Sequence, residues 1–478
     1  MPRHPSLLQI NTRTWISERG AALARAATLD DMPDTALERI ARAGFDWVWL
    51  LGVWQTGEAG RRISLRQPEW QPEYRELLDE PTEDDVAGSP FAVRDYAVSG
   101  ELGGPAALAR FRARLAARGL RLMLDFVPNH TAPDHRWVDE HPEFYVQEPD
   151  GRPAQGRDPN FPPWPDTLQL NHRHAHLRAA MLDVLHSIAA QCDGVRCDMA
   201  MLLLPDVIQR TWGERSRPAD GSPAVDEPFW PWAIQDVRRL HPGFTFMAEA
   251  YWGLDWTLQQ QGFDYTYDKT LYDRLHGQDA GAVRAHLRAD AAYQQHCARF
   301  LENHDEPRAA AVFGRRMHQA AAVVALLAPG LRFVHEGQTT GRQIRASNHL
   351  RRRAVEPVDR ELEAFYDRLM SCMSRDEMRD GDWQLLEPRP ASDGNATCDQ
   401  IVAYTWERDG RRALVAVNYG PQQAQCYLPL PCAGLGGSVE LRDLMNPAFS
   451  YTRRGEDLAR QGLYLDVPPW RHHVFALE

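Results

Sequence analysis

The sequence predicts an α/β protein built on a (β/α)8 TIM barrel, with a short excursion after strand 3 and a C-terminal antiparallel β-domain. Three observations predict this fold. Eight short apolar segments alternate with helical patterns up to about residue 375. The segments are continuously apolar, which is typical of parallel strands covered by helices on both faces. After about Asp382 the chain changes to short alternating strands separated by turn signals.

The barrel strands are expected at residues 6–11, 45–54, 120–127, 192–200, 244–251, 263–268, 297–303 and 330–337. Most of them follow an amphipathic helical pattern, and eight such units at this chain length indicate a (β/α)8 barrel. Residues 131–171 are rich in Pro, Asp, Asn, Trp and His and show no clear helix or strand pattern. We expect them to form a small excursion over the barrel mouth. The charged residues 57–90 are expected to loop over the same side.

These patterns divide the chain into three parts. Residues 1–130 and 172–381 are expected to form the barrel, and residues 131–171 the B-type excursion. Residues 382–478 are expected to form a β-sandwich domain, because segments such as IVAYTWER (401–408) and QCYLPLP (425–431) are short, alternating and bounded by turns.

Composition excludes several classes of protein. The net charge of −12 disfavours a nucleic-acid binder, since phosphate binding needs clustered Lys and Arg. No apolar run is long enough to span a membrane, and the N-terminal residues have no apolar signal region. The seven cysteines lack C-x-x-C spacing, which fits reduced thiols in the cytoplasm. The oligomeric state is not encoded in any pattern that we can identify.

Four of the expected strands end in acidic residues. The groups at these ends are Asp125, Asn129 and His130, then Arg196 and Asp198, then Glu249, and finally His304 and Asp305. Because the carboxyl ends of barrel strands meet at one mouth, acids far apart in the sequence are expected to lie together. Paired carboxylates are the groups that cleave glycosidic bonds. One attacks the anomeric carbon, and the other donates a proton to the leaving oxygen.

The fourth strand end indicates how the two acids differ. Arg196 and Asp198 are two residues apart, so both side chains point to the same side of the strand. Arg196 can therefore keep Asp198 ionised through a charge-assisted hydrogen bond. A second carboxylate beside Asp198 is expected to have a raised pKa, which separates the roles of nucleophile and acid.

These motifs resemble a known family. DFVPNH (125–130), GVRCD (194–198), AE (248–249) and ENHD (302–305) resemble, in order, the four signature regions of the α-amylase family, glycoside hydrolase family 13. WPDTLQLN (164–171) resembles a variant of its fifth region, and GFDWVWLLGVW (44–54) its second-strand region. The resemblance covers nearly the whole chain. It implies a retaining α-glycosidase that hydrolyses maltooligosaccharides or related α-glucans through a covalent glycosyl-enzyme.

The resemblance also implies a role for each matched residue. Asp198 is the expected nucleophile, Glu249 the general acid/base and Asp305 the acid that binds sugar hydroxyls. The expected substrate-binding residues are His130 and His304 on the sugar, Arg196 and Asp125 behind the nucleophile, and Phe91 in place of a stacking Tyr. The chemistry requires no cofactor. A structural calcium between barrel and excursion is a further expectation, with Asn129 as the candidate ligand.

Two departures leave the substrate open. Many relatives carry a Lys-His pair after the nucleophile, where this chain has the apolar MAMLLLP (199–205). An Asp that caps the substrate in exo-acting relatives aligns with Ala92. Linkage, chain length and endo or exo action are therefore undetermined. A transglycosidase or isomerase that transfers a glucosyl unit to a sugar is the alternative, and a non-catalytic glycan-binding homologue is a minor one. A metal-dependent barrel hydrolase is disfavoured because the first strand supplies no His.

Overall fold

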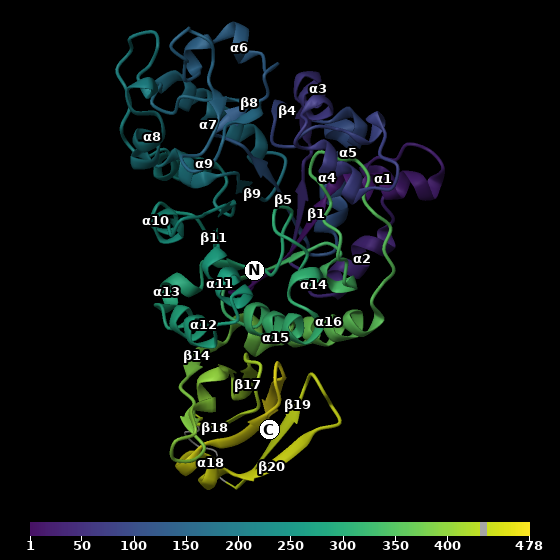
Figure 1. Ribbon diagram of the computed structural model, residues 1–478, viewed down its shortest axis with the longest axis vertical. Helices are drawn as coiled ribbons and strands as arrows, with labels where there is room; N and C mark the ends of the chain where they lie inside the picture. Colours follow the sequence, from purple (N-terminus) through teal and green to yellow (C-terminus); the bar gives the residue numbers. More distant parts are fainter. Residues whose placement is uncertain (431–436) are drawn as a thin grey trace.

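The computed structural model describes residues 1–430 and 437–478 and contains a closed barrel of eight parallel strands. In barrel order the strands are β1 (Ser6–Asn11), β2 (Trp47–Leu51), β5 (Arg121–Phe126), β9 (Gly194–Cys197), β10 (Thr245–Ala248), β11 (Tyr265–Tyr267), β12 (Cys297–Arg299) and β13 (Leu331–His335), which pairs with β1. Each lies within one of the eight expected segments, so the predicted fold class is confirmed. The barrel occupies the upper part of the molecule and the C-terminal domain the lower part (Figure 1).

Helices alternate with the strands and cover the outside of the barrel. They are α1 (Thr12–Leu23), α2 (Asp34–Arg42), α5 (Gly104–Ala116), α7 (Ala175–Ala189), α8 (Pro205–Trp212), α9 (Phe229–Leu240), α10 (Asp255–Gln260), α11 (Lys269–His276), α12 (Ala280–Leu287), α13 (Ala291–Gln294), α14 (Ala309–Val312), α15 (Arg315–Leu326), α16 (Arg360–Met373) and α17 (Asp376–Asp380). The helix α15 is buried along most of its length because it lies between the barrel and the C-terminal sheet. Among the described residues no helix is long and apolar enough to cross a membrane.

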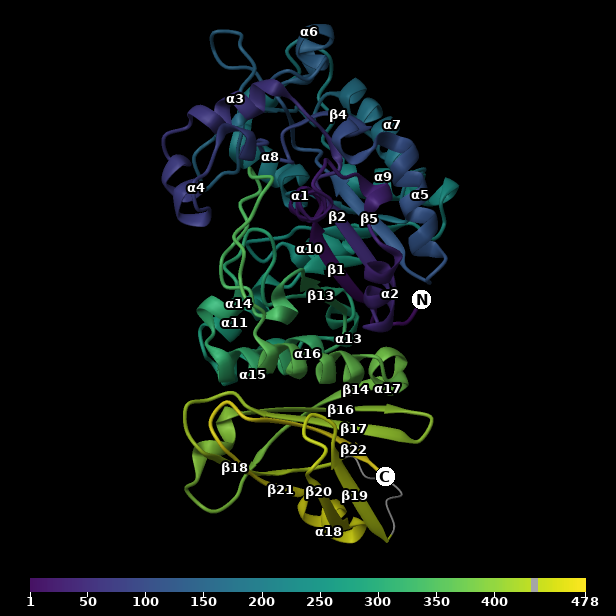
Figure 2. The same cartoon turned by 90° about the vertical axis from the view of Figure 1, so that its right-hand side faces the viewer.

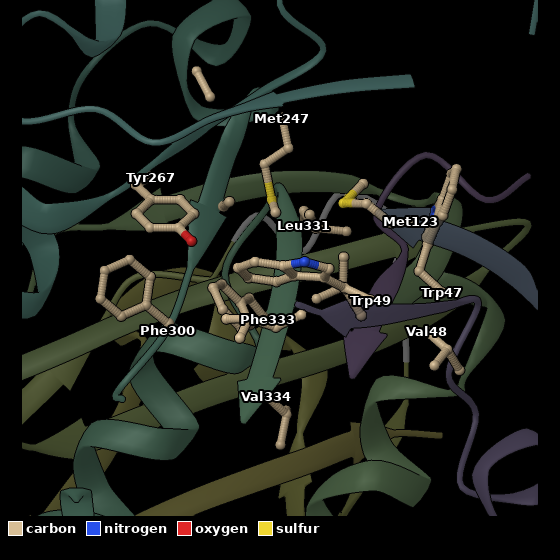
Figure 3. Close-up of a cluster of buried hydrophobic side chains, with 14 of the residues drawn as sticks. Trp47, Val48, Trp49, Met123, Met247, Tyr267, Phe300, Leu331, Phe333 and Val334 are labelled. Atoms are coloured by element: carbon tan, nitrogen blue, oxygen red, sulfur yellow. The ribbon is translucent and has the colours of Figure 1, made fainter. Parts of the chain in front are cut away.

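Large side chains fill the barrel interior. Figure 3 shows Trp49, Phe333, Tyr267 and Phe300 gathered there with Met123 and Met247. The rings of Trp49 and Phe333 are 5.7 Å apart, and those of Tyr267 and Phe300 are 5.3 Å apart. Both contacts are edge-to-face, which is a favoured arrangement of aromatic pairs. The filled interior supports the polar groups of the mouth from below.

Two segments that were expected to lack regular structure contain some. The excursion has a three-stranded sheet of β6 (His130–Thr131), β8 (Trp164–Gln169) and β7 (Gln155–Gly156), with a short helix α6 (Trp137–Glu140). Residues 57–90 form α3 (Glu58–Arg66) and α4 (Gln71–Leu77), and β3 (Trp54–Thr56) pairs with β4 (Val93–Val98). The expectation of a plain loop at 57–90 was wrong. Strands of two to six residues and helices of four to nine residues are too short to give a clear periodic pattern.

The C-terminal domain is a sandwich of two antiparallel sheets. One has the order β14 (Asp382–Leu386), β16 (Ile401–Arg408), β17 (Arg411–Asn418), β22 (His472–Leu477), β19 (Ser438–Asp443), β20 (Ser450–Arg454), and the other β15 (Arg389–Pro390), β18 (Ala424–Leu428), β21 (Leu463–Val467). Both sheets contribute to one apolar core, and α18 (Gly455–Gln461) lies at its edge. The last residue of the expected strand at 425–431 lies outside the described residues.

The sandwich is attached to the barrel through α15. The hydroxyl of Tyr404 donates to the carbonyl oxygens of Val323 and Val324, both at 3.0 Å. The indole of Trp406 donates to the carbonyl of Leu327 at 2.8 Å. Figure 2 shows α15 and α16 between the barrel and the strands β16 and β17. We propose that the three parts of the chain meet between residues 130 and 131, 171 and 172, and 381 and 382.

Candidate active site

The parallel register of the strands brings Asp198 and Glu249 to one level of the mouth and places Asp125 below them. Asp125 in β5 and Arg196 in β9 are register partners, and Arg196 is also paired with Met247 in β10. Asp198 and Glu249 come directly after β9 and β10. Their backbone N–H groups continue the ladder, since Asp198 donates to Phe126 at 2.8 Å and Glu249 to Cys197 at 3.1 Å. Both carboxylates therefore emerge side by side from neighbouring strands.

Arg196 connects the two carboxylates. One terminal nitrogen lies 2.5 Å from Asp198 Oδ1, and the other lies 2.8 Å from Glu249 Oε2. The guanidinium is fully buried beneath them, and its Nε donates to the hydroxyl of Tyr267 at 3.3 Å. Burial acts to lower the pKa of Arg196, but Glu249, Tyr267 and Asp198 raise it well above its usual value. The arginine is therefore a permanent positive charge shared by two acids.

Three aromatic rings surround the same guanidinium. Its central carbon lies 5.4 Å from the ring centre of Trp49, 5.2 Å from that of Phe91 and 5.7 Å from that of Tyr267. Cation–π attraction in this dry setting holds the arginine in place. Phe91 also packs against His304, with ring centres 5.3 Å apart.

Glu249 has the environment of a proton donor. The Tyr251 hydroxyl donates to Glu249 Oε1 at 3.0 Å, and the backbone N–H of Met199 donates to Oε2 at 2.6 Å. Burial raises the pKa of Glu249 to about 8, although Arg196 acts in the opposite direction. The carboxyl therefore carries a proton at neutral pH, which is the state that a general acid needs.

Asp125 lies below the mouth and contacts the scaffold. Its two oxygens accept from the indole of Trp49 at 2.9 Å and from the backbone N–H of Gly52 at 2.7 Å. Burial raises the pKa of Asp125 to about 6, with Arg196 opposing the change. Because both oxygens are engaged, the contacts of Asp125 position β2 and β5.

Both histidines are buried and neutral. Burial lowers the pKa of both His130 and His304, in the latter case to well below its usual value. The side-chain amide of Gln9 lies 2.7 Å from His304 Nδ1, and Asp305 Oδ2 lies 3.0 Å from Nε2. His130 Nε2 is buried and has no hydrogen-bond partner within the part of the chain that the structure describes. A buried ring nitrogen without a partner is available to a ligand.

Asp305 completes the group on the open side of the mouth. Its side chain is 42% exposed, and Asn348 donates to Oδ1 at 3.4 Å. The turn that presents it is held by Asn303, whose Oδ1 accepts from the backbone N–H groups of Asp305 and Glu306 at 2.8 and 3.0 Å. The expected site residues thus all lie at or just below one mouth.

The surroundings of Asn129 do not fit a calcium ion. The side-chain nitrogen of Gln169 donates to Asn129 Oδ1 at 2.9 Å, to the Asn129 carbonyl at 3.0 Å and to the Leu170 carbonyl at 3.0 Å. The oxygens that converge here thus face an N–H donor, and Asn129 Nδ2 donates back to Gln169 Oε1 at 3.2 Å. Calcium sites need six to eight oxygens and usually carboxylates. No cluster of three His, Cys, Asp or Glu with ligand geometry occurs in residues 1–430 and 437–478.

Sequence reasoning missed several residues of the mouth. Tyr251 lies two residues after Glu249, a spacing that places both side chains on one side of an extended chain. Tyr267 is the last residue of β11, so it also lies at a strand end that faces the mouth. Gln9 is buried in β1, and no local signal distinguished it from an ordinary core-edge residue.

Known proteins resemble this chain in sequence and in fold. The α-amylase MalA of Haloarcula japonica is 27% identical over 380 residues, which are 74% of this chain and 51% of that protein. An α-1,4-glucan:maltose-1-phosphate maltosyltransferase of Streptomyces coelicolor is 25% identical over 436 residues, 85% of this chain and 58% of that protein. The chain thus spans about half the length of these relatives.

Solved structures show the same fold. The maltogenic α-amylase AmyB of Thermotoga neapolitana superposes with a TM-score of 0.73 at 18% identity and covers 99% of this chain and 98% of its own. No family model matches the sequence. The relatives in sequence are named as an α-amylase and as maltosyltransferases, and the solved structures show the fold of the chain.

Proposed function

We propose that the protein is a retaining α-glycosidase that hydrolyses α-glucosidic bonds of maltooligosaccharides or related α-glucans. The single observation that carries this proposal is the buried Arg196, which bridges Asp198 and Glu249 with one terminal nitrogen each. One arginine holds two acids at the same site, while burial gives Glu249 a pKa of about 8. Glu249 therefore carries a proton at neutral pH, as the general acid of such a pair must.

In the first step Asp198 attacks the anomeric carbon, and a covalent bond forms to its carboxylate oxygen. The bond from that carbon to the leaving oxygen breaks, and Glu249 gives its proton to this oxygen. Arg196 stays charged and offsets the negative charge that moves onto Glu249. In the second step Glu249 takes a proton from water, the water oxygen attacks the same carbon, and Asp198 leaves as a carboxylate. Two inversions give net retention.

The remaining residues bind the sugar in this proposal. His130 Nε2 and His304 donate to hydroxyls of the cleaved residue, and Phe91 lies beneath the ring. Asp305, on the open side, accepts hydrogen bonds from hydroxyls as positive charge develops on the sugar. Asp125 acts indirectly, by holding the ends of β2 and β5 together. No cofactor takes part, and we propose a cytoplasmic location.

Transfer to a sugar is the second candidate function. Residues 200–204 after the nucleophile are buried and apolar, so this turn places no polar side chain against a water nucleophile. The curated relatives include maltosyltransferases by name. A non-catalytic glycan-binding role is disfavoured because Asp198, Glu249 and Asp305 are all present.

A product profile tests the proposal. The wild type and Asp198→Asn are incubated with maltose, maltooligosaccharides, isomaltose, trehalose, sucrose and starch, and the products are separated over time. Shorter glucans from the wild type and none from the variant support hydrolysis with Asp198 as nucleophile. Early appearance of longer or rearranged sugars supports transfer. Equal turnover by both proteins would refute the nucleophile assignment.

A further inference from the structure

A cavity of about 480 Å³ lies where the barrel meets the C-terminal sandwich. Its volume is within the range of about 300–1,000 Å³ that is typical of small-ligand sites. The helices α15 and α16 form one wall, and residues 443–451 and 466–473 of the sandwich form the other. Figure 2 shows these two helices facing the strands of the sandwich. None of the residues that line this junction cavity belongs to the catalytic mouth, so a ligand here binds at a separate site.

Two arginines from opposite walls line the junction cavity without a partner. Arg368 lies on α16, and Arg471 directly precedes β22. Both residues are exposed, and neither guanidinium has a hydrogen bond or an ion pair within residues 1–430 and 437–478. Arg315 of α15 and Arg375 after α16 are, by contrast, each paired with a carboxylate. Because the guanidinium fork matches an oxyanion, two free forks at one cavity indicate an anion site.

The two carboxylates of the cavity are engaged by other groups. Asp443 Oδ2 lies 2.8 Å from His473 Nδ1. Asp466 accepts from the side-chain amides of Gln423 at 2.5 Å and of Gln425 at 3.1 Å. Neither acid is paired with an arginine in the part of the chain that the structure describes. The charges of the two arginines are therefore open to a ligand, while the acids keep lone pairs that can accept from hydroxyl groups.

Two further side chains of the cavity suit a sugar. His472 is half-buried, and its Nδ1 is buried without a hydrogen-bond partner among the described residues. Burial lowers the pKa of His472 to about 4, with His473 and Arg471 acting in the same direction, so the ring is neutral at pH 7. A neutral ring nitrogen can form a hydrogen bond with a hydroxyl group. Phe449 is 46% exposed, and its flat apolar ring can lie against the C–H face of a sugar.

We propose that the junction cavity binds a sugar phosphate, with the phosphoryl group between Arg368 and Arg471. A phosphoryl group carries about −1.5 to −2 charges at pH 7, which two guanidinium groups balance. The sugar hydroxyls form hydrogen bonds with Asp466 and His472, and the sugar ring lies on Phe449. The ligand thereby joins α16 of the barrel to β22 of the sandwich. The inference does not rest on the proposed function, because the cavity shares no residue with the mouth.

The first experiment is titration calorimetry with glucose 6-phosphate at pH 7 and constant ionic strength. We expect Kd to be at least about ten-fold higher for Arg368→Gln and for Arg471→Gln, because each loses a charge-assisted hydrogen bond. Arg66→Gln is the matched control, since Arg66 is also exposed and without a partner but lies on α3. All three arginines are exposed, and circular dichroism checks that each variant is folded. No binding by the wild type, or the same Kd in all four proteins, would overturn the inference.

The second experiment tests the sugar part of the ligand. Inorganic phosphate is expected to bind the wild type at least about five-fold more weakly than glucose 6-phosphate, because it makes no contact with Phe449. Phe449→Ala should weaken binding of glucose 6-phosphate about five-fold and leave the Kd for inorganic phosphate unchanged. Phe161→Ala removes an exposed ring from the excursion and is the control. Equal affinity for the two ligands, or a loss of binding in Phe161→Ala alone, would contradict the assignment.

The third experiment locates the ligand without the use of variants. Amide hydrogen exchange of the wild type is followed by mass spectrometry with and without glucose 6-phosphate. We expect slower exchange in peptides that cover residues 443–451 and 466–473, and no change in peptides that cover 249–255 at the mouth. Unlabelled glucose at the same concentration should not slow exchange at the junction. Protection at the mouth alone, or at neither place, would overturn the inference, whether or not the protein hydrolyses glucans.

Discussion

Replacing Glu249 by Gln should remove a pH dependence of stability that can be calculated from the structure. The ordinary pKa of a glutamate is 4.5, and burial raises that of Glu249 to about 8. The folded protein therefore prefers the protonated acid. Stability from this group is fully present below pH 4.5 and is lost as the pH rises through 8. At about 1.4 kcal/mol per pH unit, the loss across this window is about 5 kcal/mol.

The assay is urea unfolding of the wild type and Glu249→Gln, followed by tryptophan fluorescence at pH 5 and pH 9. The variant cannot ionise at this position, whereas groups that do not contact Glu249 titrate in the same way in both proteins and cancel in the difference. Relative to the variant, the wild type should lose about 4 kcal/mol between the two pH values. A difference that changes by less than about 1 kcal/mol would refute the claim that Glu249 is folded as a neutral acid.

The same acid predicts a kinetic limit. A general acid must be protonated, so kcat/KM of the wild type should fall at alkaline pH with an apparent pKa near 8. Glu249→Gln should lose about 10²- to 10⁴-fold in kcat/KM and show no such limb. If kcat/KM instead falls with an apparent pKa below 6, the proton is donated by another group.

Three further predictions concern separate parts of the molecule. Asp198→Asn should lose on the order of 10⁴-fold or more in kcat with an unchanged circular dichroism spectrum; substantial residual turnover would move the nucleophile elsewhere. A chelator should leave the unfolding midpoint of the wild type unchanged, because Gln169 donates to the oxygens of Asn129. In Gln169→Asp, calcium should raise the unfolding midpoint. A change of the wild-type midpoint on adding chelator would contradict the interpretation of this site. Trp406→Phe should cost about 1–3 kcal/mol in urea unfolding, because the buried carbonyl of Leu327 loses its donor; Trp256→Phe at the surface is the control, and an equal cost would show that the bond is not responsible.

The sequence predicted the strands and the strand-end acids well because both depend on local patterns. A buried parallel strand is a short apolar run, and closure of the barrel then fixes which end of each run faces the mouth. Asp198 and Glu249 follow β9 and β10 directly, so their positions could be predicted from the strand pattern alone. The confirmed fold class rests on the same pattern.

The contacts within the excursion and the turns that follow the strands could not be predicted in the same way. Gln169 could be recognised as the partner of Asn129 only from contacts between residues forty positions apart. Trp252 depends on one left-handed turn, and nothing in the letters AYWG states whether the ring faces the mouth or the solvent. Within ENHDEPR, Glu302 binds Arg308 at 2.6 Å and the N–H of Ala309 at 2.7 Å. This buried acid therefore has a structural environment that its sequence neighbours do not reveal.

Met199 explains how the chain can be apolar after Asp198 and still hold Asp198 and Glu249 side by side. Its φ of 43° and ψ of 44° are left-handed, a costly conformation for this residue type. The turn directs its backbone N–H to Glu249 Oε2 at 2.6 Å. The contact uses no side-chain atom, so the residues at 199–205 can become apolar without disturbing the proton donor. The position of the Glu249 carboxyl is thus held by the backbone, whatever side chains follow Asp198.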